Sequence, residues 1–184
     1  MKLKKANAIA ALAVILFLAG HICVMTFSLW TGWYNYRICK MLPRMALTVL
    51  LVHILLSIII FFFSHDGADT RYKRLNAATI VQRATAIAMM ILIHLHMKAY
   101  AHVAAGITLS TGTTVFRIVT ELLFFASVLA HIAVSCEKAC ITLGLVRTEK
   151  SVRIIQTAAY LICTVLLLAA GCGAVSFYLK GILS

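Results

Sequence analysis

Long apolar segments separated by short polar connections dominate the pattern of the chain. A helix that crosses the hydrocarbon core of a bilayer needs about 20 mostly apolar residues. Five segments meet this condition, at about residues 6–30, 42–63, 77–101, 116–136 and 152–179. The pattern predicts an all-α membrane protein in which five transmembrane helices form a bundle, with residues 1–184 as a single integral-membrane domain.

The composition supports this prediction and excludes a soluble or disordered chain. Hydrophobic residues make up 63 % of the 184 positions and charged residues 12 %, whereas soluble domains are about 45–50 % apolar and about 25 % charged. The net charge of +12 would favour nucleic-acid binding if the basic residues formed one face of a soluble domain. They lie instead in short clusters between apolar segments, so we expect membrane lipid and no nucleic acid as a partner.

The distribution of basic residues predicts the orientation. Eleven of the 17 Lys and Arg lie in the N-terminus, in the two connections on its side or in the adjoining parts of the apolar segments, and six lie on the other side. The positive-inside rule therefore places the N-terminus in the cytoplasm and the C-terminus outside. We expect the chain to be a multi-pass protein of the cell (inner) membrane. The first apolar segment is expected to be a retained helix rather than a cleaved signal, because it is too long and no small-x-small cleavage site follows it.

Histidines inside the apolar segments are the main candidates for a function. Ionisable side chains are costly in lipid and usually face the bundle interior, and neutral imidazole is a common metal and haem-iron ligand. His21, His53 and His131 lie in three segments, and His94 and His96 share a fourth. Counting about 1.5 Å per residue predicts an outer pair, His21 with His96, and a deeper, less well matched pair, His53 with His131.

His94 and His96 cannot both serve one iron. Two residues apart on an α-helix means a rotation of about 200°, and this spacing alone does not decide which of them points inward. A dinuclear metal site is less favoured than haem, because carboxylates are almost absent from the apolar segments and di-metal clusters rely on several Glu residues.

Several short segments resemble the cytochrome b subunit of succinate dehydrogenase and fumarate reductase, of the single-chain, five-helix, two-haem type. Residues 81–86, Val-Gln-Arg-Ala-Thr-Ala, and the later His96 resemble its Gln-Arg-x-Thr-Gly segment and downstream histidine, with Ala86 in place of the glycine. Residues 144–153 resemble its connection into the last helix, and residues 11–27 resemble the family around the first histidine. The spacing from His53 to Arg83 is also similar.

The resemblance implies a function and a set of ligands. It selects His96 over His94 and makes His21, His53, His96 and His131 the axial ligands of two haem b groups, paired His21–His96 and His53–His131. The chain would transfer electrons between a quinone, expected to be menaquinone, and flavoprotein and iron–sulfur subunits on its cytoplasmic side. It would not be an enzyme on its own, but the membrane-anchor subunit of a succinate:quinone oxidoreductase.

Other polar residues can support such a site or serve the bilayer alone. Haem propionates favour basic partners, and we expect Arg83 and Arg153 to provide them; further candidates are Lys138, Arg44, Lys98 and His102. The alternative is that these side chains only follow the positive-inside rule or snorkel. Glu121 can transfer protons to or from a quinone or pair with Arg117 one turn earlier. Trp30 belongs to an interfacial aromatic belt and can border a quinone.

Two other classes of function stay open at this point. One is a different di-haem membrane reductase, similar to cytochrome b561, and the other is a haem-free transporter with proton-relay histidines.

The six cysteines are interpreted as small apolar fillers, with Cys39 expected in an outer loop. No Cys-x-x-Cys-His motif is present, so covalent c-type attachment is excluded. Pro43 is expected near the start of the second helix.

Overall fold

Five long helices make up the part of the chain that the structure, a computed structural model, describes: residues 2–63, 73–104 and 110–183. The helices are α1 (Lys2–Thr31), α2 (Tyr36–Phe63), α3 (Lys73–Ala104), α4 (Thr111–Leu143) and α5 (Glu149–Leu183). These ranges contain no strand, and each helix is long and apolar enough to cross a membrane. The predicted all-α fold with five membrane-spanning helices is therefore confirmed.

The helices extend beyond the predicted apolar segments, because polar residues at their ends cap them. Ser110 precedes α4, and its hydroxyl accepts a hydrogen bond from the backbone N–H of Thr113. Gly144 ends α4 with a positive φ of 75°, and the N–H of Leu145 donates to the carbonyl of Cys140 at 3.0 Å. Hydropathy alone finds the apolar part of a helix and misses these terminal turns.

The start of α2 corrects two sequence expectations. The Asn35 side chain accepts hydrogen bonds from the backbone N–H groups of Arg37 and Ile38, at 3.1 and 3.2 Å, so the helix begins six residues before the apolar segment. Cys39, expected in an outer loop, is therefore a buried helical residue with 6 % exposure. Pro43 lies inside α2 rather than near its start, and because proline has no backbone N–H the helix lacks one hydrogen-bond donor at this position.

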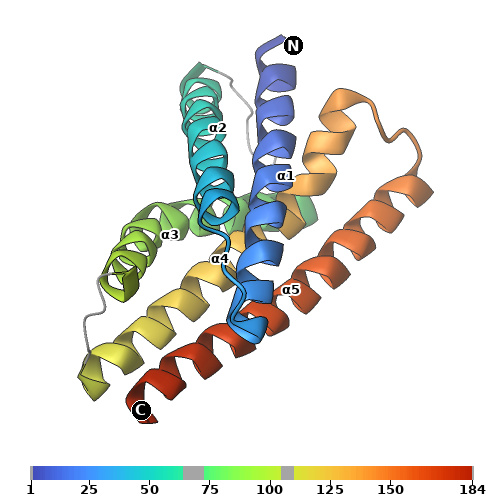
Figure 1. Cartoon of the computed structure of the whole chain (residues 1–184). Helices are drawn as coiled ribbons and strands as arrows, with labels where there is room; N and C mark the ends of the chain where they lie inside the picture. The colour runs from blue at the N-terminus through green and yellow to red at the C-terminus, as the bar shows by residue number, and fades with distance from the viewer. Residues whose placement is uncertain (1, 64–72, 105–109, 184) are drawn as a thin grey trace.

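The helices pack mainly with their neighbours along the chain. In Figure 1, α1 runs beside α2, and α4 runs beside α5; α3 packs on α4, and α1 also contacts α4 and α5. Within the described ranges, α2 packs against α1 alone. The backbones of α1 and α3 do not approach each other there, and neither do the backbones of α2 and α4. The end where α1 stops and α2 begins is called the Thr31 end below, and the opposite end the Phe63 end.

Apolar surface lies on the outside of the bundle, as expected of a chain surrounded by lipid. Leu16 and Phe62 are each 70 % exposed, and many other large apolar side chains are similarly open. The interior uses smaller residues: Leu129 and Ala133 of α4 and Cys163 of α5 form a buried cluster against which Ile22 of α1 packs. Small residues let helices approach closely where no hydrophobic effect drives them together.

We expect Gly173→Leu to destabilise the bundle where α1 crosses α5. A Cβ at Gly173 would lie 3.2 Å from Nε1 of Trp30 and 3.4 Å from Cβ of Leu29, and the Trp30 indole also donates to the Ala169 carbonyl at 3.2 Å. Overpacking of this kind costs about 1–3 kcal/mol. Thermal unfolding in detergent should show a lower Tm for this variant than for Gly112→Leu, where a Cβ meets nothing within 4 Å. Equal losses in both variants would contradict the close packing.

Candidate functional site

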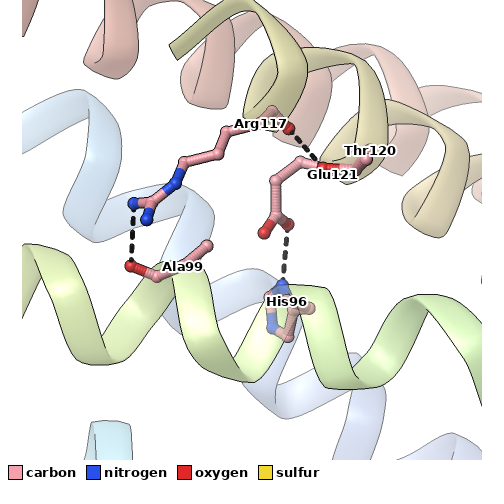
Figure 2. Close-up of polar contacts among 5 residues, drawn as sticks. All are labelled: His96, Ala99, Arg117, Thr120 and Glu121. Atoms are coloured by element: carbon pink, nitrogen blue, oxygen red, sulfur yellow. Dashed lines mark hydrogen bonds and ion pairs between the residues drawn. The ribbon is translucent and has the colours of Figure 1, made fainter. Parts of the chain in front are cut away.

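The side chains of His96 and Glu121 meet between α3 and α4, as Figure 2 shows. Nδ1 of His96 lies 2.7 Å from Oε2 of Glu121, a hydrogen bond in which the ring N–H donates to the carboxylate. The imidazole ring also stacks on Phe124, with the centroids 4.8 Å apart. With Nδ1 carrying the proton, Nε2 keeps the lone pair that a metal ligand needs.

Glu121 belongs to a buried polar group near the Thr31 end. Glu121 and Arg117 are 5 % and 8 % exposed, and Nη1 of Arg117 lies 3.5 Å from the Ala99 carbonyl of α3 (Figure 2). Tyr178 of α5 lies within electrostatic range of both charges. Glu121 forms an ion pair with His96 on the neighbouring helix, and Arg117 lies one turn earlier on its own helix.

His21 of α1 lies across from His96. The two imidazoles are close enough for an electrostatic interaction, although their helices do not pack directly. His21 lies ten residues before the end of α1, and His96 lies eight residues before the end of α3. Nδ1 of His21 is buried and has no hydrogen-bond partner within the described part of the chain.

A second pair, His53 and His131, lies nearer the Phe63 end. These rings also interact electrostatically between two helices, α2 and α4, that do not pack directly. His53 lies ten residues before the end of α2, and His131 lies twelve residues before the end of α4.

The two rings of the second pair differ in their hydrogen bonds. Nδ1 of His131 lies 3.1 Å from the Gln82 carbonyl and 3.1 Å from the Thr85 hydroxyl, so its N–H has an acceptor on α3. Nδ1 of His53 is buried without a partner among the described residues. An unsatisfied buried polar atom is costly, about 1–3 kcal/mol, and both pairs combine one supported and one unsupported imidazole.

His94 points to a different environment from His96. It is exposed, and its Nδ1 hydrogen-bonds to the Met90 carbonyl of its own helix at 3.1 Å. The helical rotation between the two positions thus directs only His96 to α4. The spacing of the two histidines could not decide this, but the structure separates them.

Two of the predicted basic residues lie near the second pair. The Arg83 guanidinium lies over the Phe61 ring of α2, 5.0 Å from its centroid, and so links α3 to a helix it does not otherwise pack against. Nζ of Lys138 donates to Oγ1 of Thr79 and Oε1 of Gln82, at 3.1 and 3.0 Å. Lys138 is also within electrostatic range of His131.

Arg153 and Trp30 have partners other than the histidines. The Arg153 side chain is 73 % exposed and pairs with Glu149 of its own helix at 2.6 Å. Trp30 is 60 % exposed, and its indole N–H is engaged by the Ala169 carbonyl rather than free to face a ligand. Arg44 is exposed and Lys98 is also exposed, while the side chain of His102 lies outside the described residues.

The four buried or half-buried histidines are the candidate ligands for a cofactor. Among the described residues, no group of three or more His, Cys, Asp or Glu side chains is placed to hold a metal ion. Haem iron needs only two axial imidazoles, and each pair offers two from different helices, with one unsupported buried ring in each. The residues present therefore fit two b-type haems held between helices that do not touch directly.

Sequence reasoning missed the partners of the imidazoles. The Thr85 hydroxyl and the Gln82 carbonyl provide the acceptors for His131, although no pattern in the sequence singles them out for this role. The same is true of Tyr178. The Gln82 acceptor is a backbone carbonyl, which the identity of a side chain does not indicate.

Comparisons with protein families, with curated proteins and with solved structures gave no match.

An apolar groove of about 860 Å³ runs between α4 and α5 on the outside of the bundle. Leu122 and Leu123 of α4 form one wall, directly after Glu121, and Leu168 and Leu179 of α5 contribute to the other. Almost all of the lining is hydrocarbon, so the groove suits an apolar chain and offers little to a polar headgroup.

Proposed function

We propose that the chain is a membrane-anchor subunit that binds two b-type haems and transfers electrons between a quinone and partner subunits. The observation that carries the proposal is that four imidazoles from four helices interact in two pairs, His21 with His96 and His53 with His131, each between helices that do not pack directly. If the histidines only formed hydrogen bonds that stabilise the fold, they would not need to lie in two pairs of this kind.

In this proposal the haems supply one-electron transfer through the iron, and the chain sets the conditions. His96 and His131 offer Nε2 because Glu121 and the Gln82 carbonyl hold the proton on Nδ1. His21 and His53 approach from the opposite helices. Arg83 and Lys138 hold positive charge near the Phe63 end, where propionates would be stabilised.

The partners follow from the resemblance to the succinate dehydrogenase and fumarate reductase cytochrome b subunit. They would be a flavoprotein and an iron–sulfur subunit, docked at the Phe63 end if that end is cytoplasmic, as the positive-inside rule predicts. The quinone, menaquinone in this proposal, would place its isoprenoid tail in a membrane-facing apolar groove such as that between α4 and α5. The chain would be an electron-transfer subunit without catalytic residues of its own.

A second candidate is a haem-free, proton-coupled transporter. The buried pair of His96 and Glu121 favours it, because ionisable pairs inside membrane helices are typical of proton relays. This function would need the His53–His131 pair as a separate relay step, and it does not account for the symmetry of the two pairs.

The absorption spectrum of the purified protein separates the two candidates. We expect reduced-minus-oxidised bands of b-type haem and, by pyridine haemochrome assay, about two haems per chain, since four imidazoles can ligate two irons. The protein should be produced with haem available, and its helical content and monodispersity should be checked first. A folded, colourless protein would overturn the proposal and favour the transporter.

A further inference from the structure

The two supported histidines have chemically different hydrogen-bond acceptors. His131 donates to the neutral carbonyl of Gln82, whereas His96 donates to the carboxylate of Glu121 over a shorter distance, 2.7 Å against 3.1 Å. A hydrogen bond to an ionised acceptor is shorter and about twice as strong as one to a neutral acceptor. The two histidine pairs therefore differ in the charge of the acceptor: His96 has a carboxylate next to its ring, and His131 has a neutral carbonyl.

The surroundings of Glu121 keep this contact in place. Its side chain is 7 % exposed, so solvent does not compete for the carboxylate. Arg117 lies one turn earlier on the same helix and is also buried, and Tyr178 faces both charges from α5. The stack of the His96 ring on Phe124 restricts rotation of the imidazole. A buried carboxylate is costly unless it is paired and hydrogen-bonded, and the contact with Nδ1 of His96 meets this condition.

We propose that Glu121 is a positioning residue for His96, an inference that rests on the proposed haem-binding function. The carboxylate holds the proton on Nδ1, directs Nε2 towards the iron and gives the imidazole partial imidazolate character, which makes it a more basic ligand. A more basic axial ligand stabilises ferric over ferrous iron. Glu121 thus lowers the midpoint potential of the haem ligated by His96 and leaves the other haem unaffected.

The test is a spectroscopic redox titration of the purified full chain and of Glu121→Gln. Gln keeps an acceptor oxygen for Nδ1–H but removes the charge. We expect the midpoint potential of one haem to rise, with the preference for the ferric state weakened about tenfold, which is about 59 mV for one electron. The second haem should keep its potential. The shifted haem is identified as the one that is missing in His96→Ala.

Two further variants separate positioning from general effects. Glu137→Gln removes another carboxylate of α4, near Lys138, and should leave the potential of the His96 haem unchanged. Glu121→Asp keeps the charge on a side chain one methylene shorter, and we expect a potential between those of the parent and Glu121→Gln. Because Asp preserves the charge at the buried position, it also provides the measurement if the Gln variant does not fold.

The outcomes distinguish this inference from the proposed function. If the parent binds two haems and both Glu121 variants titrate like the parent, Glu121 is only a structural partner of His96 and the inference is wrong, while the proposed function stands. An equal shift of both haems would also overturn it, because the effect would then be one of overall charge. A parent protein without haem overturns the proposed function and the inference together.

Discussion

Replacing His96 by alanine is expected to halve the haem content of the purified protein, from about two per chain to about one. The imidazole of His96 faces α4 and lies within electrostatic range of His21, so its loss leaves one iron with a single protein ligand. Pyridine haemochrome analysis with protein quantification measures the ratio, and the haem that stays should show an unchanged spectrum.

His94→Ala is the matched control for this experiment. His94 is two residues away on the same helix, has the same side chain, and is exposed with its Nδ1 bound to its own backbone. Its replacement should leave the haem content unchanged. Loss of haem in His94→Ala with retention in His96→Ala would show that the wrong face of α3 has been assigned to the cofactor.

His53→Ala and His131→Ala should each remove the same haem, and the double variant should lose no more than either single variant. The two rings interact across the space between α2 and α4, and one iron cannot keep its low-spin state with one imidazole missing. Haem content and the spectrum of the retained haem would measure this non-additivity, which is the expected behaviour of residues that act as one unit.

Replacing each of these histidines by glycine provides a check on folding. Imidazole added from solution can occupy the position of the lost ring, so haem binding should be restored in His53→Gly and His131→Gly if the bundle is intact. If the two alanine variants lose different haems, or if the double variant loses both, the pairing of His53 with His131 is wrong.

The positions of the helices could be predicted from the sequence because lipid imposes length and apolarity on every span. The ends could not be predicted from hydropathy, since they depend on local polar caps. Asn35 at the start of α2 and Gly144 after α4 are readable cap signals, and attention to Asn35 would have placed Cys39 in the helix.

The presence of histidines inside the apolar segments could be read from the sequence, but the partners of their rings could not. The contact of His96 with Glu121 joins positions 25 residues apart and depends on how α3 and α4 are rotated about their axes. Local spacing shows that Arg117 lies one turn from Glu121, but it carries no information about the neighbouring helix.

The sparse packing of α2 and α3 has a consequence for the order in which the chain loses structure. Within the described ranges, α2 packs against α1 alone and α3 against α4 alone, so each can separate by breaking a single interface between helices. A group bound between His53 and His131 would tie α2 to the rest of the bundle. Without such a group, we expect the amides of α2 and α3 to exchange with solvent deuterium before those of α4, which packs against three helices.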